Sequence, residues 1–226
     1  MTVAISTILP DCRLELPGIA GPVLDAKLFQ IIRQFYWESE SYKYTYDNGL
    51  DWTINATAVP SPTAGTDIPA KHVVKRVDTI HYDAGGDAWD KEVPFLTRDQ
   101  LDRANSDWNV ETGTSPSAWT TENGGIARIV PIPSATVTTG LLIRSVIAPV
   151  FTVVTDTLPD FLYYEHEAAF RAGILSQLMA QVGKDWTNLP QAQVYQAAYA
   201  AGIVKAKSRS EADFGQPKDV MAYGGI

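Results

Sequence analysis

Four carboxylates crowd into the glycine-containing stretch "DAGGDAWDKE": Asp83, Asp87, Asp90 and Glu92. Hard cations such as Ca²⁺ take several oxygen ligands from one loop, so the stretch is a candidate calcium site. Its spacing matches no EF-hand, however, and a hairpin turn with solvated charges is the favoured interpretation.

A carboxylate pair in this stretch is also the only support for a second alternative, a small hydrolase. In that case replacing Asp87 and Asp90 by Ala would abolish an activity, whereas we expect only the turn to lose stability.

The three histidines and the single cysteine do not form a metal-binding pattern. His72 and His81 lie nine residues apart on a predicted strand, whereas His166 lies on a predicted helix. A zinc site would need a fourth soft ligand nearby, and Cys12 is the only cysteine of the chain. The sequence therefore predicts no metal and no cofactor. A lone cysteine also excludes an internal disulfide and suits a reducing cytoplasm.

Motifs for nucleophilic catalysis or phosphate binding are equally weak. The chain has no GxSxG elbow, and the glycine pairs in "DAGGDA" and "ENGGIA" lack the lysine of a phosphate-binding loop. Lys205, Lys207 and Arg209 could contact phosphate near the end of the last predicted helix. Cations in a final helical turn more commonly complement the helix dipole, which is the interpretation we favour. We expect no enzyme.

An aromatic-rich stretch, "FYWESESYKYTY" from Phe35 to Tyr46, could stack on bases or sugars. The acids Glu38, Glu40 and Asp47 within or beside it would repel phosphate. We therefore expect these rings to pack the first helix onto a sheet. A carbohydrate-binding or tail-fibre accessory module stays open as the alternative function, motivated by the 6 Trp, 10 Tyr and 7 Phe of the chain.

Charge and composition favour a protein partner. The 226 residues carry 18 Lys plus Arg against 26 Asp plus Glu, which gives a net charge of −8. This balance argues against non-specific attachment to nucleic acid or to an anionic membrane. The N-terminus lacks a basic segment before its apolar groups, and no stretch approaches the roughly 18 apolar residues of a membrane span, so we expect neither a signal peptide nor an anchor.

Helical periodicity marks both ends of the chain. The first helix is predicted over Gly21–Glu40, a second from Leu158 to the stop at Gly183, and a third from Pro190 towards Asp213. The expected apolar stripes are, in chain order, Leu24, Leu28, Ile31, Ile32 and Phe35; Ala168, Ala172, Leu175, Met179 and Val182; and Val194, Ala198, Ala201 and Lys205. Because the first helix is too short to be stable alone in water, we expect it to pack on the two late helices.

The middle of the chain reads as β-structure. Hairpins are predicted around Asp47–Gly49 and around the glycine pair between residues 72 and 96. A short helix with a Thr97/Gln100 capping box follows, and then an exposed polar loop over 109–125. Residues 124–150 predict a further hairpin.

Prolines set this last hairpin apart. Pro131, Pro133 and Pro149 lie within "GGIARIVPIPSATVTTGLLIRSVIAPV". Since proline donates no amide hydrogen to a ladder, it is confined to edges, strand starts and bulges. We therefore expect an arm that ends at a sheet edge.

Together these elements predict an α+β fold in one domain, residues 1–226. A helical bundle, about 15–42 and 158–210, is interrupted by a β-rich insertion, about 43–157, with hairpin arms. A flexible tail, 214–226, closes the chain, since its three glycines and its proline keep it from folding alone. The tail spaces four apolar residues that could insert into a partner and are candidate interface residues: Phe214, Val220, Met221 and Tyr223.

The order of several stretches resembles a known family. They are "LDAKLFQIIRQFYWES", "PFLTRDQLD", "AWTTENGGIARIVPIP" and the closing pair from "LPDFLYYEHEAAF" to "GIVKAKSR". From about Leu14 to Arg209 the chain is similar to the head-to-tail adaptors of tailed bacteriophages, also called connector, neck or tail tubular proteins. No single motif is diagnostic; the order and spacing carry the resemblance.

The resemblance implies a structural virion protein in the neck of the particle. Such a protein would form a dodecameric ring that docks on the portal protein, binds tail or nozzle proteins below, and prolongs the channel for genomic DNA without reading its sequence. It would assemble in the host cytoplasm and reside at the portal vertex, without a membrane. The proline-bounded hairpin would then be an arm reaching a neighbouring subunit, and the tail residues would bind the portal.

Overall fold

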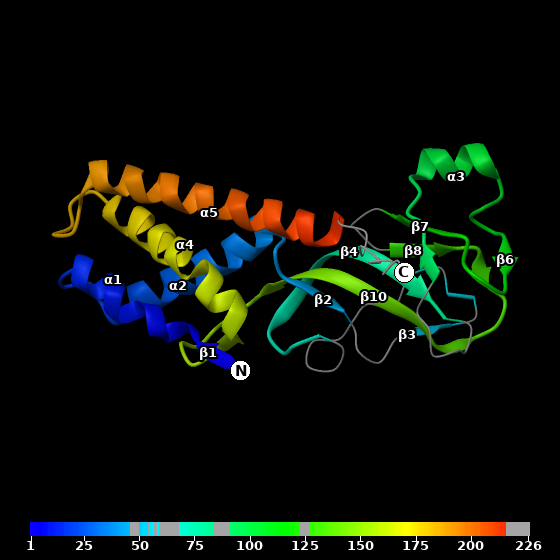
Figure 1. The fold of residues 1–226 in the computed structure, drawn as a ribbon, viewed down its shortest axis with the longest axis horizontal. Coiled ribbons are helices and arrows are strands. Elements are labelled where there is room, and N and C mark those ends of the chain that lie inside the picture. The colour runs from blue at the N-terminus through cyan, green and yellow to red at the C-terminus, as the bar shows by residue number, and fades with distance from the viewer. Residues whose placement is uncertain are drawn as a thin grey trace, which may run out of the picture. The chain divides into compact units, whose positions relative to one another are not determined.

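A computed structural model describes residues 1–45, 50–53, 55–56, 58, 68–83, 91–122 and 127–215. The chain divides into two compact units, one made of Met1–Tyr42 with Pro149–Ile226 and the other of Lys43–Ala148. Helices dominate the first unit and strands the second (Figure 1). The predicted α+β class is therefore confirmed.

The helical unit holds four α-helices among its described residues, and Figure 1 shows α4 running alongside α5. α4 also contacts α1 and α2, and α5 contacts α2. Strands β1 and β11 pair antiparallel, with Thr2 opposite Pro159. The elements of this unit are β1 Thr2–Ala4, the 3₁₀ helix η1 Ile5–Ile8, α1 Leu9–Glu15, α2 Gly21–Ser39, β11 Thr157–Pro159, α4 Asp160–Met179 and α5 Leu189–Gly215.

Helix α2 forms as its sequence predicts. Pro22 occupies the first turn, where a missing amide hydrogen is harmless. The helix ends at Ser39, and the next residue, Glu40, caps it with a left-handed φ of 53°. All five residues of its predicted apolar stripe are buried. The stripe faces α4 and α5, so the predicted packing of the first helix on the late helices is confirmed.

Helix α4 is the most buried of the helices. Its predicted start at Pro159 and Asp160 is confirmed, but it ends at Met179 rather than at Gly183. Two members of its predicted stripe, Ala168 and Val182, are exposed. The other three are buried: Ala172, Leu175 and Met179.

Helix α5 presents a different face to the core from the one predicted. All members of its predicted stripe are exposed, from Val194 to Lys205, whereas Ala192, Tyr199 and Ala206 are buried. Small apolar residues occur on both sides of α5, so their period alone does not identify the core face. Tyr199 identifies it, because its ring is buried and its hydroxyl donates to the carbonyl oxygen of Ile31 at 3.4 Å.

Helix α1 is tied to the late helices by polar contacts. The Glu15 carboxylate accepts hydrogen bonds from the guanidinium of Arg171 on α4 and from the hydroxyl of Tyr195 on α5. Cys12, one turn earlier, is fully buried. The N-terminal segment is thus part of the helical core.

In the second unit a five-stranded sheet has the order β2-β10-β4-β5, and β3 also pairs with β10. Two further pairs of described strands are β6 with β9 and β7 with β8, and an isolated bridge joins Phe95 to Trp119. The bounds are β2 Lys43–Thr45, β3 Leu50–Trp52, β4 His72–Tyr82, β5 Lys91–Val93, α3 Arg98–Ala104, β6 Thr112–Gly113, β7 Ala118–Thr121, β8 Ala127–Val130, β9 Ile132–Pro133 and β10 Val137–Pro149.

One of the three predicted hairpins is confirmed. β4 and β5 pair antiparallel, with Ile80 opposite Val93. The predicted turn at 47–49 lies outside the described residues, but β2 and β3 both run antiparallel along β10 and so point the same way. The hairpin predicted there is therefore wrong, since β2 and β3 are successive segments alongside one long strand.

The hairpin predicted over 124–150 is also wrong. Its first strand, β8, pairs with β7, and its second, β10, is central in the five-stranded sheet. Pro149 ends β10 as expected, whereas Pro133 lies in the two-residue strand β9 and is paired with Gly113 of β6. Local sequence identified the strand ends but not their partners.

Helix α3 carries the predicted capping box. The Thr97 side chain accepts from the Gln100 amide while the Gln100 side chain accepts from the Thr97 amide, at 3.4 and 2.8 Å. The exposed loop expected over 109–125 is confirmed for residues 109–112, but β6 and β7 lie within the stretch and residues 118–120 are buried, while 123–125 lie outside the described residues. Ala118, buried on β7, joins a small core with Leu101 and Trp108.

The tightest packing of the helical unit supplies a stability test. A Cβ on Gly173 of α4 would lie 2.8 Å from Ile31 Cγ2 and from Tyr199 Cδ2. We expect Gly173→Val to lower the free energy of unfolding by about 2 kcal/mol, because both neighbours are themselves buried and cannot retreat. Chemical denaturation followed by far-UV circular dichroism measures the change.

The matched control is Ala168→Val, which puts the same side chain on an exposed position of α4. We expect it to stay within about 0.5 kcal/mol of the parent. Equal loss in the two variants would contradict the packing argument.

Candidate docking surface

The structure does not gather the residues singled out for metal or acid–base chemistry. Among the residues it describes, no three His, Cys, Asp or Glu side chains are placed to hold a metal ion. Asp87 and Asp90 lie outside the described residues, while Asp83 follows β4 and Glu92 lies on β5 opposite His81. His72 is the first residue of β4, and its Nδ1 lies 2.9 Å from the carbonyl oxygen of Ala70, which precedes the strand.

His166 and Cys12 are core residues of the helical unit. The His166 ring packs on Phe35 and Tyr36, with centroid distances of 4.8 and 6.0 Å, and burial lowers its pKa. Burial raises the pKa of the Cys12 thiol to about 12. A nucleophilic cysteine needs an accessible thiolate, so Cys12 is placed as a packing residue.

The three cations of "KAKSR" do not lie in a final helical turn. Because α5 continues to Gly215, Lys205, Lys207 and Arg209 precede its end by more than a turn, and the predicted dipole role is wrong. Arg209 Nη1 donates to Glu165 Oε1 of α4 at 2.6 Å. Successive helical residues are about 100° apart, so Lys205 and Lys207 point to different sides and form no single phosphate site.

Most described rings of the aromatic-rich stretch are buried. Phe35 packs edge-on against Phe170 at 5.1 Å, and the Tyr36 hydroxyl donates to the Leu162 carbonyl oxygen at 3.3 Å. These partners belong to α4, so the predicted packing of Phe35 and Tyr36 onto a sheet is wrong. Trp37 is the exception, with 41% of its surface exposed.

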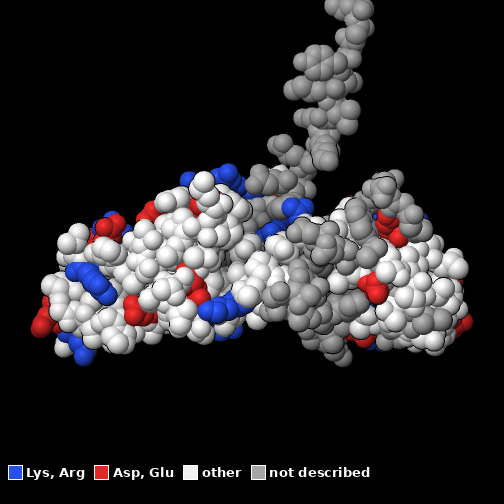
Figure 2. Space-filling model, turned by 90° about the horizontal axis from the view of Figure 1, so that it is seen from below, with Lys and Arg blue, Asp and Glu red and all other residues white. Residues whose placement is uncertain are grey.

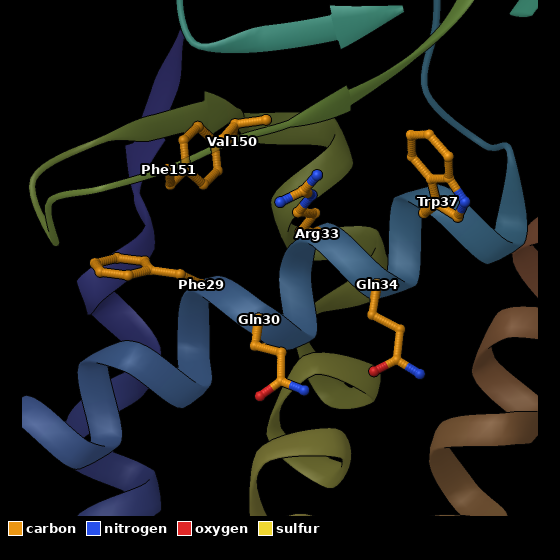
Figure 3. A pocket seen from close by; sticks show the side chains of 7 residues that line it. All are labelled: Phe29, Gln30, Arg33, Gln34, Trp37, Val150 and Phe151. Carbon is orange, nitrogen blue, oxygen red and sulfur yellow. The ribbon is translucent and has the colours of Figure 1, made fainter. Parts of the chain in front are cut away.

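Trp37 borders a groove along the outward side of α2 (Figure 3). The groove has a volume of about 490 Å³ and lies wholly within the helical unit. Figure 3 shows Phe29 and Trp37 towards its two ends, with Arg33 between them and Phe151 across from α2. Its lining residues are Phe29, Gln30, Arg33, Gln34, Trp37, Val150 and Phe151.

Helical geometry explains this row. Phe29, Arg33 and Trp37 follow one another at intervals of four residues, so they lie along one side of α2. That side points away from the buried stripe containing Ile31 and Phe35. This four-residue spacing is present in the sequence, but two aromatic residues and an arginine on one side of a helix do not by themselves predict a groove.

Arg33 gives the groove its chemistry. Among the residues that the structure describes, Arg33 forms no hydrogen bond and no ion pair, whereas Gln30 accepts from Lys27 and Gln34 donates to Glu38, each at 2.8 Å. Aromatic walls suit an apolar side chain, and a guanidinium between them suits a carboxylate. A protein segment that carries both would match this lining.

The predicted tail contacts fall mostly beyond the described part of the chain. Phe214 belongs to the last turn of α5 instead of following the helix. Val220, Met221 and Tyr223 lie outside the described residues.

Charge is dispersed on the face drawn in Figure 2. Basic and acidic side chains are scattered over the helical unit and separated by wide uncharged areas. No described helix has the length and apolar character needed to cross a membrane. Broad uncharged surface is typical of contacts with other proteins.

Comparison with known proteins adds a family. The model of a family described as "SU10 adaptor protein" matches residues 21–220, which include all of α2, α4 and α5 and the whole second unit. No curated protein matches the chain significantly.

Burial of Cys12 predicts slow alkylation. Because the thiolate is the reactive form and the pKa is raised to about 12, we expect iodoacetamide at mildly alkaline pH to label the folded chain at least about a hundredfold more slowly than the chain unfolded in guanidinium chloride. Intact mass spectrometry over time measures both rates. Equal rates would contradict the placement of Cys12 in the core.

Proposed function

Since the chain belongs to the SU10 adaptor protein family, a family of phage head-to-tail adaptors, we propose that it forms a ring between the portal and the tail and prolongs the DNA channel. The match over residues 21–220 carries this proposal, because it spans both compact units. We assign the ring twelve copies, the number that the resemblance implies. The chain would thus be a structural protein of the virion neck, assembled in the host cytoplasm.

The domain organisation fits this role as one adaptor domain. We propose that α2, α4 and α5 act as a helical bundle that forms the body of each subunit, and that residues 43–148 are its β-rich insertion. The insertion would contact tail or nozzle proteins or a neighbouring subunit. The contact that the sequence analysis expected of a hairpin arm would then be made by the long, irregular β10 and the strands that pair with it.

A role without catalysis agrees with the site. The groove on α2 offers aromatic walls and one guanidinium, a pattern suited to holding a protein segment. A net charge of −8 would let packaged DNA pass without sticking, because little is gained from counterion release. We therefore assign the chain no enzymatic activity, no cofactor and no sequence-specific contact with DNA.

The alternative function, a carbohydrate-binding or tail-fibre accessory module, has weaker support. Sugar binding needs accessible ring faces, yet Phe35 and Tyr36 are fully buried in the helical core. Trp37 keeps an exposed ring but lies beside Arg33 in the groove. A glycan array separates the two functions, since the adaptor should bind no glycan.

Ring assembly on the portal is the direct test. We expect the purified chain and purified portal rings to combine into a particle whose added mass equals about twelve subunits, because the portal supplies burial that a single subunit lacks. Mass photometry of the mixture measures the number. A particle with two or three added copies, or a stable dimer indifferent to the portal, would overturn the adaptor function.

The tail provides a second test. Truncation after Asp213 should leave the thermal melt within a few degrees of the parent, since no buried residue of α5 lies beyond Ser210 among those described. It removes Phe214, Val220, Met221 and Tyr223, so we expect co-sedimentation with portal rings to fall at least about tenfold. Unchanged attachment together with an unchanged melt would exclude the tail as the portal contact.

A further inference from the structure

A ring built from identical subunits needs two different contact surfaces on each subunit. A head-to-tail contact joins one surface to a complementary one on the next copy, and repetition closes the ring. This inference rests on the proposed function, and it assigns the two surfaces. The α2 groove is concave, so its complement must protrude, carry large apolar groups and supply a carboxylate.

We propose that the first two turns of α4 from a second copy occupy the groove. Phe161 and Tyr164 are each 65% exposed there, and among described residues no other pair of aromatic side chains is more than half exposed. Residues three and four apart share a helix side, which places Phe161, Tyr164 and Glu165 together. We call this protruding set the α4 ridge.

The positive charge of Arg33 in the groove favours the α4 ridge as the segment that binds there. Glu165 supplies a carboxylate one turn after Phe161 and next to Tyr164, and Asp160 lies in the first turn of the same helix. Arg33 has no partner among the described residues, so a carboxylate from the next copy would satisfy it. Glu165 Oε1 already accepts from Arg209, and the side chains of Arg209 and Glu165 are 60% and 27% exposed. A carboxylate has a second acceptor oxygen. The Glu165 carboxylate can therefore accept from both guanidinium groups.

A second exposed apolar surface of the helical unit, on α5, fails on charge. The outer face of α5 carries Val194, Ala198 and Val204, yet no acidic residue occurs between Val194 and Lys205. Lys205 would bring a second cation to Arg33, and like charges that meet in an interface cost several kcal/mol. The groove thus discriminates between the two faces.

We propose a heterologous contact, in which one copy's ridge fills the next copy's groove and the two copies do not exchange ridges reciprocally. Each copy that accepts a ridge still presents its own ridge to the next, so growth continues until the ring closes. Trp37 and Phe29 would form the walls that receive Phe161 and Tyr164. Aromatic anchors seated in a partner's pocket commonly dominate the energy of an interface.

Charge reversal tests the pairing on portal rings. We expect Arg33→Glu and Glu165→Arg each to reduce the population of complete rings at least about tenfold, because like charges then meet at the contact. The double variant, which restores opposite charges, should recover ring formation. Lys207→Glu is the matched control, since it reverses an exposed cation of α5 outside both surfaces.

Disulfide trapping gives a second readout. A chain with Arg33→Cys and Glu165→Cys should form intermolecular disulfides upon oxidation in the assembled state and give a ladder of covalent oligomers. The native Cys12 is buried and would not contribute. A chain carrying only one of the two substitutions should give no ladder.

The outcomes separate this inference from the proposed function. If the parent chain forms no ring on the portal, the proposed function fails. If the parent forms rings and both single reversals assemble equally well, or the double cysteine chain gives no ladder within intact rings, the assignment of groove and ridge fails while the ring stands. Circular dichroism of each variant confirms that its helices are retained, and loss in both singles with recovery in the double establishes the pairing.

Discussion

The close approach of three helices at Gly173 determines most of the helical unit. The α4 backbone comes so near to Ile31 and Tyr199 that a single added carbon would overlap both side chains. That contact joins α2, at the start of the chain, to α4 and α5, at its end. It also orients α2: Arg33 lies about 200° around the helix from Ile31, so fixing Ile31 inward turns the groove outward. The side of α2 that packs in the core and the side that borders the groove are therefore opposite each other.

The sequence correctly predicted the elements that depend on interactions between residues close together in the chain. The stripe of α2 and the capping box at Thr97 were both read correctly, since each depends on residues within a few positions of one another. The β4–β5 hairpin likewise follows from a short connection between its two strands. Where the interaction that defines an element is nearby in sequence, the pattern was sufficient.

Contacts between distant residues were not predictable in this way. β10 pairs with β2, β3 and β4, whereas β8, which precedes it in the chain, pairs with the earlier strand β7. Likewise α5 carries small apolar residues on opposite sides, and only the position of Tyr199 against Ile31 reveals which side is covered. The groove was not predictable from the sequence, because Phe29, Arg33 and Trp37 border a groove only when Phe151, more than a hundred residues later, lies across from them.

The pairing of β1 with β11 bears on the order of events at the ribosome. Thr2 lies opposite Pro159 in this antiparallel pair, so the first strand to leave the exit tunnel waits for more than half of the chain before its partner is synthesised. Residues 43–148, by contrast, are contiguous and emerge as one piece. Domains generally fold as units during translation. The inserted unit can thus reach its native state while the N-terminal helices are still without their partners, and the helical unit matures last, when α5 arrives to cover it.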